Sequence, residues 1–442
     1  MSTYFRAPLM AAALMALAGC GIFKGGHGRH TPTVGNRVPI LVSETSIAAD
    51  PSIATVEVLL PAAAVNPGWT QPGGNAQKSM GQLALGEAPQ RLWSAQIAGG
   101  SNRERLAATP VIADGKLYIV DVDAQVHAFA ADTGAALWTV GIPRDRTNRE
   151  ARFGGGVSFD EGKLYATDGL GEVVALQASD GHELWRAKPG GPLRGSPTVA
   201  NGIVYVLTQD DQLYALNQDT GAVNWAGQGT AETQGVFGVA APAAGQGSVI
   251  AGFSSGELNA YRYENGRQLW QDALGRSSIS TSVSSIADID AAPVIDSGRV
   301  YAVGQGGRMV ALDLGTGRRQ WEQNLAGIST PWLAGEWLFV VTDDARLVCL
   351  SGSSGKARWI AQLRRFRKER SRKGPITWFG PVLAGGKLVL TNSEGEIVYT
   401  SPTDGHVLST ARVSKDGFAL GPVVANSVLY TVDQRGRLTA WR

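Results

Sequence analysis

Two aspartates separated by one residue are the first candidates for chemistry in this 442-residue sequence. Asp288 and Asp290 lie in the segment Ile-Ala-Asp-Ile-Asp over residues 286–290. Side chains alternate along an extended chain, so both carboxylates would point to the same side. Such a pair can bind arginines of a partner protein through charge-assisted hydrogen bonds. Two aspartates that cap a turn are the alternative, and the residues alone favour neither interpretation.

A run of positive charge over residues 364–373 is the second candidate, with the sequence Arg-Arg-Phe-Arg-Lys-Glu-Arg-Ser-Arg-Lys. Because it lies between two of the repeats described below, we interpret it as a long basic loop. A loop of this charge could contact an acidic partner, anionic lipid or the cell wall. The alternative is a solvated loop without a partner.

The first twenty residues predict export and lipid attachment. Arg6 precedes an apolar stretch over residues 7–17, which is too short to span a bilayer and suits the core of a signal peptide. It runs into Leu-Ala-Gly-Cys, which resembles the bacterial lipobox. The resemblance implies that residues 1–19 are removed and that Cys20 carries fatty-acyl chains such as palmitate, each buried methylene contributing about 0.8 kcal/mol. By resemblance to lipoprotein sorting rules, Gly21 implies the outer membrane.

Other reactive side chains are sparse, and we predict no catalytic residue, cofactor site or metal site. The chain has five histidines, and no His/Cys cluster has zinc-ligand spacing. No nucleophile elbow, P-loop or haem motif is present. The second of the two cysteines, Cys349, takes a position that alanine fills in most repeats. We therefore expect it to be a small buried apolar residue.

The elements that must position these residues follow from a phrase that recurs along the chain. Its clearest copy is Ala-Leu-Asp-Leu-Gly-Thr-Gly-Arg-Arg-Gln-Trp over residues 311–321. From Trp138 to Trp359 the tryptophans of successive copies are 47, 40, 45, 51 and 38 residues apart, and a further copy has Ser409 in place of tryptophan. Periods of this size indicate a repeat array. We expect the tryptophan to pack between neighbouring sheets and the glycine to form a tight turn.

Each repeat contains four short strands. In the third repeat the apolar runs 196–200, 203–207, 212–216 and 223–225 are separated by turn residues, among them the hairpin signal Asn201-Gly202. A helical period is absent after residue 40. Eight third strands are expected, at Gln125–Ala130, Glu172–Gln177, Gln212–Asn217, Glu257–Arg262, Arg308–Asp313, Arg346–Ser351, Glu396–Ser401 and Arg437–Trp441. Seven of the eight first strands are expected to begin with proline, which is tolerated there.

The ends of the chain predict how the ring closes. The sequence stops at Arg442, directly after the eighth third strand, while residues 91–97 read as a fourth strand with no repeat before it. We therefore predict an all-β, eight-bladed β-propeller over residues 86–442, in which the N-terminal strand completes the last blade. Residues 20–85 are expected to be a lipidated tether and extension, with short strands at 40–42 and 56–60.

Composition agrees with one large all-β body. Charged residues make up 18% of the chain, below the usual quarter, as expected for much internal surface. The net charge is only +2, which predicts no nucleic-acid binding.

The recurring phrase resembles the motif Ala-x-Asp-x-x-Thr-Gly-x-x-x-Trp of pyrroloquinoline-quinone (PQQ)-like repeat propellers. Two groups carry it: the quinoprotein dehydrogenases and the BamB family, β-propeller lipoproteins of the outer-membrane β-barrel assembly (BAM) complex. The resemblance to the BamB family covers residues 17–442, from the lipobox to the last repeat. The dehydrogenases are longer and carry a vicinal Cys-Cys disulfide and a metal-bound cofactor. Cys20 and Cys349 cannot form such a disulfide.

The resemblance implies a non-catalytic scaffold without a cofactor, facing the periplasm and assisting the insertion of β-barrel proteins. Its implied partners are the POTRA region of BamA, other BAM components and nascent outer-membrane proteins. The family has an acidic pair at a BamA contact, which corresponds here to Asp288 and Asp290. A second contact segment, Leu-x-Leu-Arg-Gly, corresponds by its offset to residues 234–238, with Val236, Phe237 and Gly238 at its last three positions. Phe237 replaces the arginine and is expected to anchor an apolar contact.

Two other functions are considered. One is a periplasmic PQQ-dependent oxidoreductase that binds the quinone in its central channel. The other is a propeller that binds cell-wall or carbohydrate ligands of the envelope.

Overall fold

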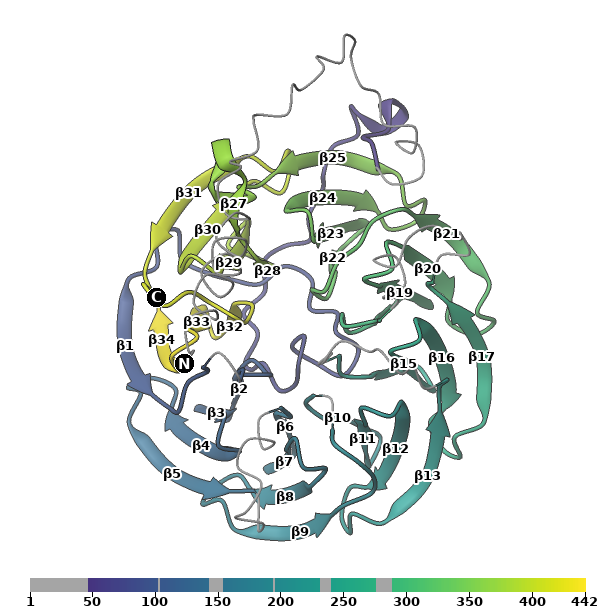
Figure 1. The fold of residues 1–442 in the computed structure, drawn as a ribbon, viewed down its shortest axis with the longest axis vertical. Coiled ribbons are helices and arrows are strands. Elements are labelled where there is room, and N and C mark those ends of the chain that lie inside the picture. The colour runs from purple at the N-terminus through teal and green to yellow at the C-terminus, as the bar shows by residue number, and fades with distance from the viewer. Residues whose placement is uncertain (1–46, 102–103, 143–153, 194, 231–239, 276–287) are drawn as a thin grey trace, which may run out of the picture. The chain divides into compact units, whose positions relative to one another are not determined.

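A computed structural model describes residues 47–442 except 102–103, 143–153, 194, 231–239 and 276–287. Within these residues eight four-stranded antiparallel sheets are arranged around a central axis, as Figure 1 shows. The only helical elements there are the short 3-10 turns η1 (Pro51–Ile53) and η3 (Glu369–Ser371). The predicted eight-bladed, all-β propeller is confirmed.

The blades follow one another along the chain, and each runs from its innermost strand outward. Blade 1 is β2 (Val111–Ala113), β3 (Lys116–Val120), β4 (Gln125–Ala130) and β5 (Ala136–Gly141), and blade 2 is β6 (Val157–Asp160), β7 (Lys163–Thr167), β8 (Val173–Gln177) and β9 (Glu183–Ala187). Blade 3 is β10 (Thr198–Ala200), β11 (Ile203–Leu207), β12 (Gln212–Asn217) and β13 (Val223–Gln228), and blade 4 is β14 (Ala243–Gly245), β15 (Ser248–Gly252), β16 (Glu257–Arg262) and β17 (Gln268–Ala273).

The second half of the ring repeats this order. Blade 5 is β18 (Val294–Asp296), β19 (Arg299–Val303), β20 (Met309–Asp313) and β21 (Arg319–Gln323), and blade 6 is β22 (Trp332–Ala334), β23 (Trp337–Val341), β24 (Arg346–Ser351) and β25 (Ala357–Gln362). Blade 7 is β28 (Trp378–Ala384), β29 (Lys387–Asn392), β30 (Glu396–Thr400) and β31 (Val407–Arg412). Blade 8 is β32 (Val423–Ala425), β33 (Val428–Val432), β34 (Arg437–Trp441) and β1 (Arg91–Gln96).

The ring closes where the N-terminal strand completes blade 8, as predicted. β1 pairs antiparallel with β34, with Ser94 opposite Thr439. Gln90 and Arg442 exchange backbone hydrogen bonds of 2.6 and 2.8 Å beyond the strand ends. In Figure 1 the dark blue β1 lies beside the yellow β34. Closure leaves no open seam of unpaired backbone across the ring.

Turn residues and strand residues account for the blades locally. Asn201 and Gly202 have φ of 55° and 74°, the left-handed values that a tight hairpin between β10 and β11 requires. All five residues of β11 are buried, as expected for an apolar strand covered on both faces. The eight third strands lie within one residue of their predicted bounds. The prolines precede the first strands by one residue, except Pro381, which lies inside β28 at a register shift.

Tryptophans and glycines join neighbouring blades, as the repeating phrase predicts. Trp270 in β17 donates its indole N–H to the carbonyl of Leu314 in blade 5 at 2.8 Å. Equivalent bonds of 2.8–3.4 Å are made by Trp93, Trp138, Trp185, Trp225, Trp321 and Trp359, each to a carbonyl of the next blade. The apolar clusters that form the core accordingly lie between blades as well as within them.

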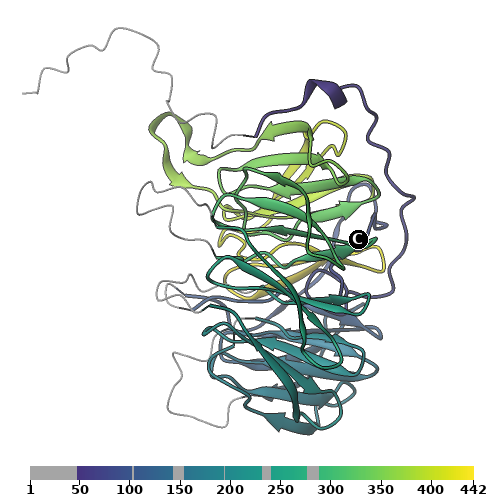
Figure 2. The same ribbon diagram turned by 90° about the vertical axis from the view of Figure 1, so that its right-hand side faces the viewer.

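Residues 47–90 belong to the same compact unit as the ring. The strand expected over residues 56–60 does not form, and that segment has no ladder partners in the described chain. The strand expected over residues 40–42 lies outside the described residues. Farther along, residues 66–83, which we call the axial segment, run across the inner ends of the blades. Figure 1 shows this purple part of the chain near the centre of the ring, and Figure 2 shows it on the side opposite the hairpin described next.

The basic run between blades 6 and 7 is a hairpin, where the sequence predicted a loop. β26 (Phe366–Lys368) pairs with β27 (Lys373–Pro375) across the turn η3. The Glu369 carboxylate accepts hydrogen bonds from the backbone N–H groups of Arg365 and Phe366 at 3.2 and 3.4 Å. Arg372 takes the left-handed conformation with φ of 50°, which lets the chain reverse.

Candidate functional site

The links that contain the predicted contact residues leave and enter their blades on one side of the ring. In a four-stranded antiparallel blade, the link from the fourth strand to the next blade leaves on the same side as the turn between the second and third strands. The segments 229–242, 274–293 and 363–377 are all links of this kind. We call this side the connector face. Figure 1 views the ring from this side, with the hairpin in front.

Asp288 and Asp290 lie at the end of the connector between blades 4 and 5, and both are buried, with 0% and 9% of their surface exposed. Gln305, in the turn between β19 and β20, holds this part of the chain from two directions. Its backbone N–H donates to the carbonyl of Asp288 at 2.9 Å, and its side-chain amide donates to the Asp290 carboxylate. Ile289 packs against Gly252 at the end of β15. The acidic pair is therefore built into the junction of two blades.

The other predicted contact residues, Val236, Phe237 and Gly238, lie outside the described residues, as do the lipid-anchor residue Cys20 and the predicted signal peptide. The chain on either side of 231–239 is described. Thr230 donates from its backbone N–H and its hydroxyl to the carboxylate of Glu257 at 2.8 and 2.7 Å. Both predicted contact segments are thus joined to the connector-face ends of blade 4, one at each side of it.

The axial segment contacts every blade, a feature that the sequence did not predict. Its hydrogen bonds are those of Asn66 with Val424, Trp69 with Ile112, Thr70 with Phe159, Gln71 with Val199, Ala76 with Ala244, Gln77 with Ile295, Gly81 with Trp332 and Leu83 with Leu383, at 2.8–3.0 Å. Trp69 also stacks on Trp332 with ring centroids 5.9 Å apart. This stretch has no periodicity, and its large apolar residues are only Trp69, Met80 and Leu83, of which Trp69 and Leu83 are buried.

Lys78 is the buried charge of the axial segment, with 2% of its surface exposed. Its ammonium donates to the hydroxyl of Thr198 at 3.1 Å, and that hydroxyl donates to the carbonyl of Pro242 at 2.6 Å. Burial away from water lowers the pKa of Lys78 from 10.5 to about 7. Its backbone takes a left-handed conformation with φ of 65°.

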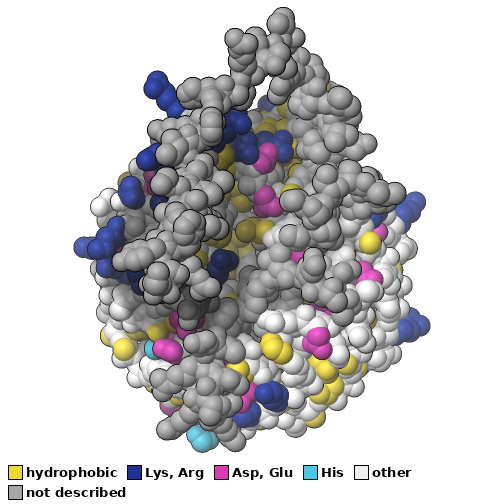
Figure 3. All heavy atoms as spheres, viewed as in Figure 1, with side chains coloured by type: hydrophobic (Ala, Val, Ile, Leu, Met, Phe, Trp, Pro, Cys, Tyr) yellow, Lys and Arg dark blue, Asp and Glu magenta, His cyan; other side chains and the backbone are white. Residues whose placement is uncertain are grey.

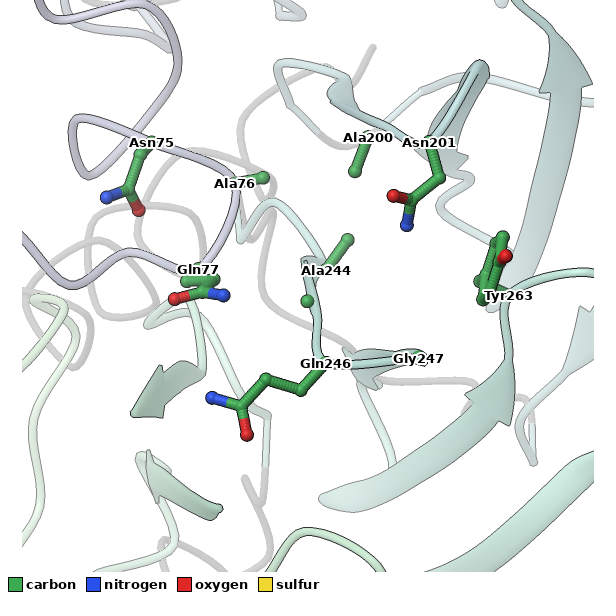
Figure 4. Close-up of a pocket in the computed structure, with 10 residues that line it drawn as sticks. Asn75, Ala76, Gln77, Ala200, Asn201, Ala244, Gln246, Gly247 and Tyr263 are labelled. Carbon is green, nitrogen blue, oxygen red and sulfur yellow. The ribbon is translucent and has the colours of Figure 1, made fainter. Parts of the chain in front are cut away.

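An open groove of about 520 Å³ lies between the axial segment and blades 3 and 4. Amide side chains dominate its lining: Asn75, Gln77, Asn201 and Gln246, with Tyr263 at one end, as Figure 4 shows. Gln246 already accepts a hydrogen bond from the backbone of Gly298 at 3.2 Å. The lining supplies hydrogen bonds, and its only titratable group is a tyrosine.

Acidic residues of the connector face mostly stabilise turns. Asp121 accepts backbone hydrogen bonds from Asp123 and Gln125, both at 2.9 Å, and its other oxygen lies 2.7 Å from Nε2 of His127. Asp168 makes the same pair of bonds in blade 2, where burial raises its pKa to about 6. In the described part of the chain, no group of three or more His, Cys, Asp or Glu residues could hold a metal ion.

Two further observations concern the rest of the chain. Cys349 is buried in β24, as expected, and burial raises the pKa of its thiol. As for membrane-crossing helices, none in the described residues has the required length and apolar character.

The chain matches the model of a known protein family. The family model described as outer membrane protein assembly factor BamB matches residues 122–361. Proteins of that name are similar over most of their length: the one from Yersinia pestis is 26% identical over 80% of this chain and 89% of its own, and the one from Salmonella typhimurium is 29% identical over 80% and 88%. The Xanthomonas campestris protein is 29% identical over 80% and 85%.

Solved structures agree on the fold. BamB from Moraxella catarrhalis superposes with a TM-score of 0.68 at 19% identity, covering 80% of this chain and 99% of that one. Quinohemoprotein alcohol dehydrogenase from Comamonas testosteroni superposes with a TM-score of 0.65 at 14% identity, covering 86% and 81%. Identities this low establish a shared propeller and leave the activity open.

Proposed function

Since this chain belongs to the family of outer membrane protein assembly factor BamB, we propose that it is a scaffold of the outer-membrane protein assembly machinery. In this proposal the ring docks on the POTRA region of BamA, contacts other BAM components and assists the insertion of β-barrel proteins. A lipid anchor on Cys20 holds it at the periplasmic side of the outer membrane. The match of the family model to residues 122–361 is the observation that carries the proposal; it includes β4 and β5 of blade 1, blades 2 to 5 and nearly all of blade 6.

The axial segment supports a role without catalysis. The alternative, a PQQ-dependent oxidoreductase, needs a quinone in the central channel. At one end of that channel the inner-strand backbones of Ile112, Ala244 and Ile295 are hydrogen-bonded to the chain itself, and Trp69 and Trp332 stack there. These residues do not fit a quinone at that end, and we assign no reaction step to one.

We propose that the connector face beside blade 4 is the docking surface. Asp288 and Asp290 are buried, and Asp290 is the more accessible of the two. In this proposal the two aspartates fix the connector, and the connector residues that precede them contact the partner. Val236, Phe237 and Gly238 supply the other half of the surface in this proposal. The two segments border the same blade, so one rigid partner domain could meet both.

Binding to purified BamA POTRA domains tests this surface. The chain from residue 20, with Cys20→Ser, is titrated with the POTRA domains in solution without lipid. We expect Phe237→Ala to weaken binding at least tenfold, because aromatic residues are frequent hot spots. Asp290→Asn, which keeps the shape of the buried side chain, is expected to weaken it less. Arg318→Ala, on the opposite face, is the control. If Phe237→Ala and Asp290→Asn both bind like the unmodified chain, the surface is wrongly assigned.

The outer strands suggest how a client protein could bind. β31 is the edge strand of blade 7, and all six of its residues are exposed. Val407 and Leu408 in this strand are large apolar residues with about half of their surface exposed, at 51% and 45%. An exposed strand edge with apolar side chains can add a strand of another chain. We propose this edge as the contact for nascent outer-membrane proteins, with Leu408→Lys expected to reduce crosslinking to an unfolded barrel protein.

A further inference from the structure

The basic hairpin between blades 6 and 7 has no part in the docking surface just proposed. It extends from the connector face, and Figure 2 shows it as the light green loop that projects beyond the blades. Seven Lys or Arg residues and one Glu lie in residues 364–373. In Figure 3, Lys and Arg side chains gather in this region, at the upper left of the view.

Two of the three arginines at the base of the hairpin form ion pairs with blade 7. Arg364 lies 3.1 Å from the carboxylate of Glu396, and Arg367 lies 2.6 Å from the carboxylate of Glu394. The one acid of the run, Glu369, is turned back to the backbone N–H groups at the base. These contacts fix the direction of the hairpin, and four of the five cations that form no ion pair with a described residue lie toward its tip.

The tip carries four exposed cations, Lys368, Arg370, Arg372 and Lys373, and none of them is in an ion pair with a described residue. Lys368 lies directly opposite Lys373 in the strand register. Like charges in that position repel each other and destabilise a two-stranded sheet. An anionic surface at the tip would reduce this repulsion. The hairpin is therefore expected to be more stable when it is bound to such a surface than when it is free in water.

The distribution of charge favours a layer of anionic head groups over a protein surface. Lys368 and Lys373 are a cross-strand pair and project from the same face of the hairpin, while Arg370 and Arg372 lie in the turn that joins its two strands. A protein partner would be expected to use a buried aromatic or aliphatic anchor. The aromatic residue here, Phe366, is half-buried at the base, with the guanidinium of Arg365 5.6 Å from its ring centroid. A membrane surface needs no such anchor, because each Lys or Arg near anionic lipid adds to binding independently.

We propose that the tip of this hairpin binds anionic phospholipid head groups and is a second membrane contact beside the lipid anchor. The inference rests on the proposed outer-membrane location. Lipid chains and a basic patch together anchor a protein more firmly than either signal alone. The contact would also fix the rotation of the ring relative to the bilayer, which a flexible anchor leaves free.

Vesicle sedimentation tests the proposal directly. The chain from residue 20 with Cys20→Ser is mixed with phosphatidylcholine vesicles that contain or lack phosphatidylglycerol. We expect binding only to the phosphatidylglycerol vesicles, and release at high salt because such contacts are screened. The double variant Arg370→Gln, Lys373→Gln is expected to bind about 25-fold more weakly, about fivefold for each cation.

The matched control removes the same charge elsewhere. Arg267→Gln, Arg318→Gln changes two exposed cations in the turns of the opposite face, and we expect less than a twofold effect. Equal weakening by both double variants would overturn the proposal, as would a failure of the unmodified chain to sediment with phosphatidylglycerol. Retention by an acidic envelope protein without any vesicle binding would also overturn it. Because no BAM component is present, this result is independent of the POTRA titration.

Discussion

The indole of Trp270 lies over Gly317 of the next blade, so closely that a Cβ on this glycine would be 2.5 Å from the indole Cγ. The same relationship links Gly134 to Trp93, Gly181 to Trp138, Gly221 to Trp185, Gly266 to Trp225, Gly355 to Trp321 and Gly405 to Trp359. The glycine of the repeating phrase therefore has two functions. It takes the left-handed turn, with φ of 70° at Gly317, and it leaves room for the tryptophan of the preceding blade.

Replacing Gly317 should cost more than replacing a glycine that serves only a turn. Gly317→Ala is expected to lower the free energy of unfolding by about 2–4 kcal/mol, from the left-handed backbone and the clash with Trp270. Gly298 is the matched control, since its φ is 75° and no atom lies within 4 Å of its would-be Cβ. Gly298→Ala should cost about 1–2 kcal/mol. Urea unfolding measures both, and equal losses would contradict an inter-blade role for Gly317.

The single copy without tryptophan has a structural explanation. Ser409 in β31 would contact the turn between the third and fourth strands of blade 8, but β34 and β1 are not joined by a turn. No glycine of the repeating phrase is present there to receive an indole. We therefore expect Ser409→Trp to change stability by less than about 0.5 kcal/mol, as for an ordinary surface site. A gain above 1 kcal/mol in chemical denaturation would show that blade 8 offers an indole pocket after all.

The sequence predicted the ring well because its signals are local and repeated. Asn201-Gly202 specifies its hairpin by backbone conformation alone, and the regular spacing of the tryptophans indicates successive blades. The prediction failed where contacts are distant in sequence: Asn66 meets Val424 across 358 residues, and no local pattern indicates that pairing. The burial of Asp288 was also unpredictable, since it depends on Gln305 in the following blade. The basic run was predicted as a loop. Its hairpin depends on the carboxylate of Glu369, which accepts backbone hydrogen bonds, and on the left-handed conformation of Arg372, and neither is visible as a local sequence pattern.

The axial segment should be a cooperative part of the fold. Trp69 has 3% of its surface exposed and stacks on Trp332. Trp69→Ala is expected to cost about 3–5 kcal/mol, the range for removing a buried tryptophan. It should also expose residues 47–90 to limited proteolysis while the blades stay intact. Val65→Ala, at a residue with 64% of its surface exposed, should do neither. Unchanged proteolysis of the Trp69 variant would contradict the assigned contacts.

Lys78 predicts a pH dependence of stability with a definite sign. Its pKa is lowered to about 7 in the folded chain, so the unfolded chain binds more protons between pH 7 and about 10. This group therefore destabilises the fold at and below pH 7, and the penalty fades as pH rises. Lys78→Met should be more stable than the unmodified chain at pH 6.5, and this advantage should shrink by about 2–3 kcal/mol at pH 9. Lys415→Met, at an exposed lysine, should show no such trend; a constant advantage of Lys78→Met across this range would mean that Lys78 keeps its ordinary pKa.

Affinity purification of the lipidated chain from detergent-solubilised outer membranes tests the central claim most directly. A scaffold of the assembly machinery should co-purify with BamA, and Phe237→Ala should reduce the BamA recovered at equal amounts of the tagged chain. Recovery of the intact, folded protein from the outer membrane without BamA would contradict the account.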